Sequence, residues 1–171
     1  YSDFPFSSLP DTLQNDNCPL GIAVSLDDTV QPFSTTLHVV PNIVIVGVGC
    51  RKGTDADVFE RFLLDILRTQ RISLRSVQAL ASIDLKKDES CILAFCNKYQ
   101  VNFYTYSARE LFNVKGTFQA SAFVEQVTGV DNVCERSALA AIDGDGTLIL
   151  GKQSSSGVTA ALAMKQWRCE F

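Results

Sequence analysis

The sequence predicts an α/β fold, a three-layer domain with a mixed, mostly parallel sheet. The first observation is the β-branched run IVIVGVG, residues 43–49, which ends in glycines and passes directly into a helical pattern. Apolar runs of this kind are typical of parallel strands that are buried on both faces. The second is that strand-like and helix-like segments alternate along the chain, as in layered α/β domains. The third is a closing pair of strands, 147–150 and 158–164, which predicts that the sheet is partly antiparallel.

The first helix is the most clearly marked element. Thr54 is a suitable N-cap, and Asp57 follows it in the first turn. Apolar residues then recur every three or four positions and form one buried face. These residues are Val58, Phe59, Phe62, Leu63, Ile66 and Leu67. Arg68 and Arg71 stand at the carboxyl end, where the helix dipole favours cations.

The remaining elements follow from apolar patterning, capping residues and glycine stops. The expected strands are 79–83 and 101–105, and the expected helices are 88–99, 107–112, 121–128 and 134–142. The second of these helices opens with the capping box Ser107-Ala-Arg-Glu110. Upstream, residues 21–25 and 35–41 are expected to form a small hairpin. We therefore divide the chain into 1–41, a linker and the remnant of a preceding module, and 42–171, the main domain.

The composition argues against several classes of protein. The 171 residues are 46% hydrophobic and 20% charged, and no apolar run approaches the roughly 20 residues of a membrane span. A net charge of −4 argues against a nucleic-acid partner. The six cysteines have no C-x-x-C spacing and no signal peptide precedes them, so we expect reduced thiols and a cytoplasmic protein. Because His38 is the single histidine, we expect no histidine-based zinc site and no Ser-His-Asp triad.

The loop after the first long strand is the first candidate site. It begins with Gly47 and Gly49 and has the spacing G-x-G-x-x-x-G, one residue longer than the dinucleotide fingerprint and without a G-K-[ST] ending. A purely structural tight turn is one interpretation. However, Arg51 and Lys52 stand at a helix N-terminus, which favours binding of a carboxylate or phosphate. Cys50 fits a structural or substrate-lining role better than a nucleophilic one, because no histidine is available to activate it.

Three further groups of charged residues follow strand ends or begin helices. Lys86 could hold an anion while Glu89 acts as a base, although a solvated acidic loop would show the same pattern. Glu135 is either a catalytic acid or base, or simply an acidic residue favoured by a helix dipole. Lys152 and Ser154 are expected in a loop between the last two strands, either as ligands of the substrate or on a flexible surface.

Five segments, in order and with matching spacing, resemble the C-terminal domain of the CbiG family and its stand-alone relative CobE. The segments are VGVGCRKGT (46–54), ALASIDLKKDE (79–89), FYTYSARELFNVKG (103–116), VCERSALAA (133–141) and GKQSSSGVTAALA (151–163). The resemblance covers residues 44 to about 163. We also expect Ser82, in the second segment, to be a substrate-binding residue.

The resemblance implies a role in the anaerobic pathway of cobalamin biosynthesis. CbiG proteins open the δ-lactone of cobalt-precorrin-5A and release acetaldehyde, which gives cobalt-precorrin-5B. The implied partner is this cobalt corrinoid, a macrocycle that carries many carboxylates, and no separate cofactor or metal is expected because the cobalt belongs to the substrate. We expect four cations to converge on one cleft at the carboxyl ends of the strands, and these are Arg51, Lys52, Lys86 and Lys152.

Residue type suggests roles in this chemistry. Glu89 or Glu135 could serve as the base, and Lys86, Lys152 or the N–H groups near Cys50 could stabilise an oxyanion. Two other functions stay open. Because complete CbiG proteins carry an additional N-terminal domain, this chain could be a CobE-like module that binds corrinoids without hydrolysis, with that domain or other pathway enzymes as partners. A nucleotide-binding α/β domain is the third reading.

Overall fold

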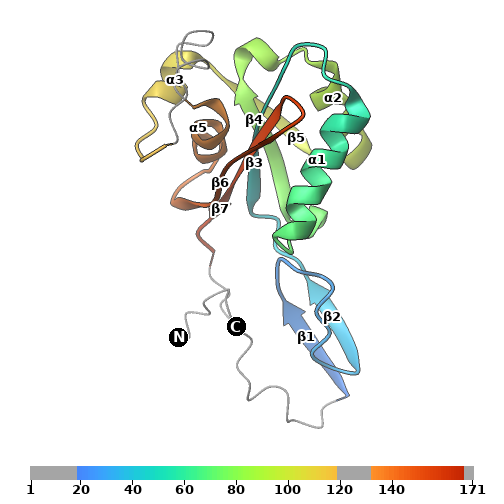
Figure 1. Ribbon diagram of the computed structural model, residues 1–171. Helices are drawn as coiled ribbons and strands as arrows, with labels where there is room; N and C mark the ends of the chain where they lie inside the picture. Colours follow the sequence, from blue (N-terminus) through green and yellow to red (C-terminus); the bar gives the residue numbers. More distant parts are fainter. Residues whose placement is uncertain (1–18, 119–131, 168–171) are drawn as a thin grey trace.

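A computed structural model describes residues 19–118 and 132–167, which form one five-stranded sheet, one two-stranded sheet and the helices around them (Figure 1). The strands are β1 (Leu20–Val24), β2 (Thr35–Val39), β3 (Val44–Cys50), β4 (Val77–Ile83), β5 (Asn102–Tyr106), β6 (Gly146–Ser155) and β7 (Val158–Lys165). The helices are α1 (Ala56–Thr69), α2 (Ser90–Tyr99), α3 (Ala108–Phe112) and α5 (Val133–Ala140), with short 3₁₀ turns η2 (Leu74–Ser76) and η3 (Asp84–Lys86). None of the described helices is long and apolar enough to span a membrane.

The main sheet is mixed, as the sequence predicts. Its strand order is β5-β4-β3-β7-β6, with β3, β4 and β5 parallel and β7 antiparallel to both of its neighbours. Four of the five strands therefore run in the same direction. β3 is the central strand, and its side chains are buried from Val44 to Val48.

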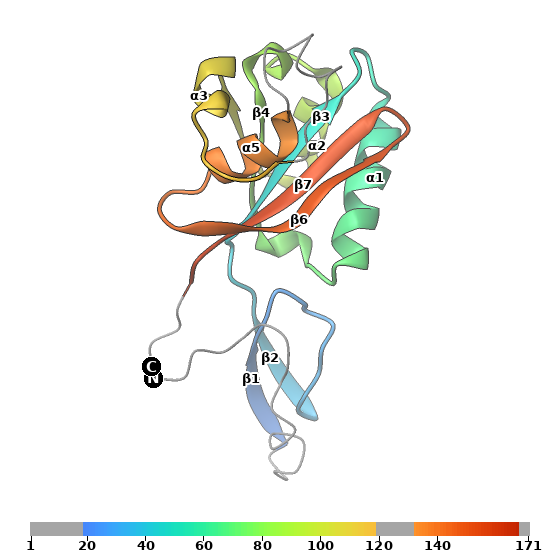
Figure 2. The same cartoon turned by 60° about the vertical axis from the view of Figure 1, so that its left-hand side comes forward.

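Helices cover both faces of this sheet, which confirms the three-layer prediction. Side chains alternate along a strand, so Val44, Val46 and Val48 point to one face. There they pack with Phe59 and Leu63 of α1 and with α2. The neighbouring residues of β3 and β4 point to the other face, which α5 covers (Figure 2). The small residues on this second face let α5 lie close to the strands.

The start of α1 differs by one residue from the prediction. Asp55, not Thr54, is the N-cap, because its carboxylate accepts hydrogen bonds from the backbone N–H groups of Asp57 and Val58. The hydroxyl of Thr54 instead donates to the carbonyl oxygen of Arg51, at 2.7 Å, and so closes the loop before the helix. The predicted capping box at Ser107 and Glu110 is present.

The predicted hairpin between 21–25 and 35–41 is wrong, because β1 and β2 pair in parallel. The chain that leaves β1 is held against the main domain, where Ser73 N–H donates to the Leu26 carbonyl at 2.7 Å and Ser73 Oγ donates to Asp28 at 2.8 Å. The connection must therefore return along the full length of β1 before β2 begins. Contacts distant in sequence thus accompany the parallel pairing.

The last two strands are longer than predicted, and the loop expected to hold Lys152 and Ser154 is strand β6. Only Ser156 and Gly157 form the turn, with φ angles of 51° and 79°. Two consecutive left-handed residues make the tight turn that suits the twist of a hairpin, so pairing continues almost to the tip. The helix expected at 121–128 lies outside the described residues.

Candidate functional site

Three segments meet beyond the carboxyl ends of β3 and β4. We call this end of the sheet, and not an outer strand, the edge of the sheet. Because these strands are parallel, the loop after Cys50 and the η3 turn after β4 lie at the same edge. The turn between β6 and β7 joins them there, because Arg51 N–H donates to the Gly157 carbonyl oxygen at 3.0 Å (Figure 2). The Arg51 side chain lies over Gly157. A Cβ atom added to Gly157 would lie 2.9 Å from Cδ of Arg51.

Glu89 connects two of these segments. Its Oε1 accepts a hydrogen bond from Gly53 N–H at 2.7 Å, and its Oε2 lies 3.0 Å from Lys86 Nζ. Burial alone would raise the pKa of Glu89, but the Gly53 N–H and the Lys86 and Lys52 ammonium groups outweigh it and lower the pKa below its usual range. Glu89 is therefore a carboxylate at neutral pH, positioned beside cations.

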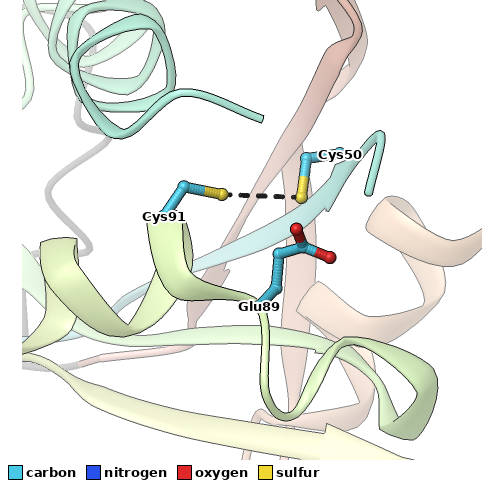
Figure 3. A group of neighbouring side chains, drawn as sticks. All are labelled: Cys50, Glu89 and Cys91. Carbon is cyan, nitrogen blue, oxygen red and sulfur yellow. Dashed lines mark hydrogen bonds between the residues drawn. The ribbon is translucent and has the colours of Figure 1, made fainter. Parts of the chain in front are cut away.

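Cys50 and Cys91 lie next to Glu89 (Figure 3). Their Sγ atoms are 3.7 Å apart, and the two sulfurs and a Glu89 oxygen lie within 4.8 Å of one another. Burial, reinforced by the neighbouring Cys91, raises the pKa of Cys50 to about 12, although Lys86 opposes this shift. Cys50 is thus a protonated thiol and a poor nucleophile in the free protein. Cys91 gives no signal of a site in the sequence, because it resembles any other apolar residue on the buried face of α2.

Glu135 and Lys152 form a second group, on the α5 side of the sheet. Glu135 is only 1% exposed, and its carboxylate accepts hydrogen bonds from Asn132 Nδ2 at 2.7 Å and from the backbone N–H of Lys152 at 2.6 Å. Asn132 is also the N-cap of α5 and accepts from the Glu135 N–H. The carboxylate therefore joins the start of α5 to β6. Neither Asn132 nor this connection was anticipated from the sequence.

Three predicted substrate-binding residues lie in the packing beneath the edge. A Cβ on Gly47 would overlap the carbonyl oxygen of Cys134, so this glycine lets α5 contact β3 directly. A Cβ on Gly49 would come within 2.7 Å of Thr159 Oγ1, which donates to the Gly49 carbonyl. Ser82 is fully buried and donates from Oγ to the Val48 carbonyl at 2.7 Å.

The structure thus brings Cys50, Arg51, Lys86 and Glu89 to one edge of the sheet, with Lys52 exposed beside them. Lys152 is half-buried in β6 next to Glu135, and Ser154 is exposed further along the same strand. The convergence of Lys152 on a shared cleft stays a prediction. What the first group can do chemically is hold an anionic ligand beside an ionised carboxylate.

Comparison with known proteins identifies the domain. The model of the family described as cobalamin synthesis G C-terminus matches residues 44–163. The chain is 36% identical to the cobalt-precorrin-5A hydrolase of Priestia megaterium over 124 residues, and 29% identical over 126 residues to that of Salmonella typhimurium. These matches cover 72% and 73% of this chain but only 33% and 35% of the two hydrolases. The chain therefore spans about a third of the length of these relatives.

A solved structure shows the same fold. The crystal structure of CobE, a protein from the cobalamin biosynthetic pathway, superposes with a TM-score of 0.69 at 29% identity. The match covers 74% of this chain and 92% of CobE. The main sheet and its helices are thus an arrangement already seen in a protein of this pathway.

Proposed function

The chain belongs to the cobalamin synthesis G C-terminus family, and we propose from this that it acts in cobalamin biosynthesis as the C-terminal part of a cobalt-precorrin-5A hydrolase. The family match over residues 44–163 is the observation that carries the proposal. The proposed reaction opens the δ-lactone of cobalt-precorrin-5A and releases acetaldehyde. In this proposal the cobalt is a part of the substrate.

The charge distribution supports a substrate that carries many carboxylates. The chain as a whole is acidic, with a net charge of −4, so it must bind an anion through local cations. Arg51 and Lys52 are exposed at the edge of the sheet, and Lys86 is half-buried beside them. The Arg51 guanidinium is suited to a two-pronged hydrogen bond with a carboxylate. These three side chains are the proposed substrate-binding group.

Lys86 and Glu89 are the proposed catalytic pair. Water must add to the lactone carbonyl, and the oxyanion that forms needs a positive group beside it. Lys86 supplies that group, and its Nζ lies 3.0 Å from the Glu89 carboxylate. Glu89 can also accept a proton from the attacking water or in the later carbon–carbon cleavage. Glu135 fits this role less well, because it is 1% exposed and accepts a hydrogen bond from the backbone of β6.

The remainder of the hydrolase is the proposed partner. The chain spans about a third of the curated hydrolases, and the β1–β2 sheet presents an apolar face. Ile22 and Leu37 are paired in the parallel register and are 61% and 58% exposed, with Val39 beside them at 44%. Adjoining exposed apolar side chains are typical of a contact surface. We expect this face to pack on the part of the hydrolase that the chain does not span.

A CobE-like module that binds corrinoids without hydrolysis is the second candidate. The observation in its favour is the length of CobE, because this chain matches 92% of the CobE structure. Both candidates place the protein in the cytoplasm, in accord with the four cysteines of the described residues, all of which are free thiols.

Anaerobic release of acetaldehyde from cobalt-precorrin-5A tests the proposal. The chain is assayed alone and together with the amino-terminal two thirds of the Priestia megaterium hydrolase. Release by the chain alone, or by the chain together with the hydrolase segment, supports the proposal. Release only when both are present assigns the remaining catalytic groups to the hydrolase segment. Binding without release in both mixtures would favour the CobE-like module, and absence of both binding and release would overturn both candidates.

A matched pair of variants connects this activity to the edge of the sheet. Lys86→Met removes the proposed oxyanion-stabilising charge and is expected to lower turnover at least about 100-fold, as loss of one oxyanion-hole donor does. Arg68→Ala removes an exposed cation at the far end of α1, about 20 Å along the helix from the site, and is expected to leave turnover unchanged. Equal losses in both variants would contradict the assignment of Lys86.

A further inference from the structure

We propose that Cys50, Glu89 and Cys91 form a binding site for a thiophilic divalent cation of the zinc or cobalt(II) type. The sequence alone predicts no metal site, because it offers a single histidine and no C-x-x-C pair. The three donors instead come from two elements that the fold brings together. Cys50 is the last residue of β3, Glu89 is the N-cap of α2, and Cys91 lies in the first turn of α2. The site shares Glu89 with the proposed catalytic pair, but metal binding can be tested without the hydrolase reaction.

The distance between the sulfurs fits a shared ion. Two thiolates bound to one tetrahedral zinc, each about 2.3 Å from it, lie about 3.8 Å apart. In the structure Cys50 Sγ and Cys91 Sγ are 3.7 Å apart and point toward one another (Figure 3). A disulfide would require the sulfurs to approach to about 2.05 Å. An ion can therefore enter between them with little change in either side chain.

Glu89 supplies a third potential ligand atom beside the two sulfurs. All three potential donor atoms lie within 4.8 Å of one another. In a tetrahedral site, a carboxylate oxygen about 2.0 Å from the ion lies about 3.5 Å from each sulfur. The Gly53 N–H holds Oε1 at 2.7 Å and Lys86 Nζ lies 3.0 Å from Oε2, so both contacts fix the carboxylate beside the two sulfurs. Outer hydrogen bonds of this kind orient metal-binding carboxylates in many proteins.

The charges of the group are balanced when a divalent ion is bound. Two thiolates and one carboxylate carry three negative charges, which the ion and the ammonium group of Lys86 together neutralise. Lys86 lies 3.0 Å from Glu89 and can keep its contact with the carboxylate. Binding releases the two thiol protons to solvent, so no oxidant or reductant is required.

The donor set also indicates the class of ion and an open position. Thiolates select zinc, cobalt(II) and similar ions over magnesium and calcium, which prefer oxygen ligands. Three protein ligands leave the fourth position of a tetrahedral ion for water or an anionic ligand. Cys50 is half-buried, and exposed Arg51 and Lys52 follow it directly. An anion bound to the ion would therefore meet these cations.

Titration of the reduced full chain with Co²⁺ under anaerobic conditions tests the site. We expect one ion to bind per chain, with sulfur-to-cobalt charge-transfer absorption and strong visible bands of tetrahedral Co²⁺, and we expect Zn²⁺ to displace it. Cys50, the half-buried thiol of the pair, should become protected from a thiol reagent. Absence of thiolate charge-transfer bands, or an octahedral spectrum, would overturn the proposal.

Three variants and one control locate the ion. Cys50→Ser and Cys91→Ser should each remove most of the charge-transfer absorption, and Glu89→Gln should weaken Co²⁺ binding about tenfold or more. Cys96→Ser, at another buried cysteine of α2, is the control and should leave the spectrum unchanged. Far-UV circular dichroism checks the fold of each variant, and Cys50→Ala and Cys91→Ala replace any serine variant that fails to fold. Retention of the spectrum in folded Cys50 and Cys91 variants would assign the signal to other thiols and sink the proposal.

Discussion

Two glutamates that look equivalent in the sequence occupy opposite environments in the structure. Glu89 lies at the edge of the sheet, where one oxygen accepts from the Gly53 N–H and the other contacts Lys86. Glu135 lies under α5, is 1% exposed, and accepts from the backbone N–H of Lys152 in β6. Both begin helices, but Glu89 lies among exposed loops at the edge of the sheet, whereas Glu135 is buried between α5 and β6. Position relative to the packed layers therefore separates a candidate for chemistry from a structural connection.

The largest expected effect is on stability, at Glu135. Glu135→Ala leaves the Lys152 N–H and the Asn132 amide without this acceptor in a buried region, which should lower the free energy of unfolding by about 3–5 kcal/mol. Glu89→Ala should cost about 1 kcal/mol, because water can replace the carboxylate at exposed Gly53. Urea denaturation of both variants measures the difference. Similar losses in the two variants would remove the distinction drawn between the two glutamates.

The two glycines of β3 also differ in what surrounds them. Gly47→Ala forces a methyl group onto the backbone carbonyl of Cys134, so we expect a loss of about 3 kcal/mol as α5 is pushed from the sheet. Gly49→Ala meets only the side-chain oxygen of Thr159, which can rotate, and should cost about 1 kcal/mol. Thermal denaturation followed by circular dichroism gives both values. Equal costs would show that α5 can shift as easily as a single hydroxyl group.

Much of the fold is predictable because it is encoded locally. The run 43–49 and the periodic face of α1 each carry their own pattern, and strand alternation then requires helices on both faces. The pairing of β1 with β2 is not predictable in this way. The segment that joins these strands contacts the main domain through Leu26 and Ser73, which are distant in the sequence and leave no local pattern.

The candidate site also contains residues that the sequence predicts and residues that it does not. The rule that ligand-binding loops follow parallel strands correctly brings Cys50 and Lys86 to one edge. Cys91 was missed because a buried cysteine on a helix resembles any small apolar residue. The burial of Glu135 also could not be anticipated, since its acceptor role depends on Lys152, which reaches it through the register of the last two strands.

Substitutions of Lys86 and Lys152 should also differ in their effect on the free energy of unfolding, by a smaller amount. Lys86→Met breaks an ion pair in which the side chains are 19% and 9% exposed, and should lower the free energy of unfolding by about 1 kcal/mol. Lys152 connects to Glu135 through its backbone, which Lys152→Met retains, so its cost should stay below about 0.5 kcal/mol. Urea denaturation at neutral pH compares them. A larger loss in Lys152→Met would show that its side chain, and not only its backbone, supports the α5 side.

The smallest expected effect is a pH dependence of the free energy of unfolding that Glu89 causes. Its folded-state pKa lies below the ordinary value of 4.5, so the stability it adds is present above pH 4.5 and is lost as the pH falls through the lower folded-state pKa. The difference in unfolding free energy between the wild type and Glu89→Gln should therefore shrink on acidification below pH 4.5. Other carboxylates with lowered pKa values, such as Glu60 and Glu110, are common to both proteins and cancel in this difference. A difference that stays constant with pH would show that Gly53 and Lys86 do not stabilise the ionised form, and the contrast with Glu135 would then rest on burial alone.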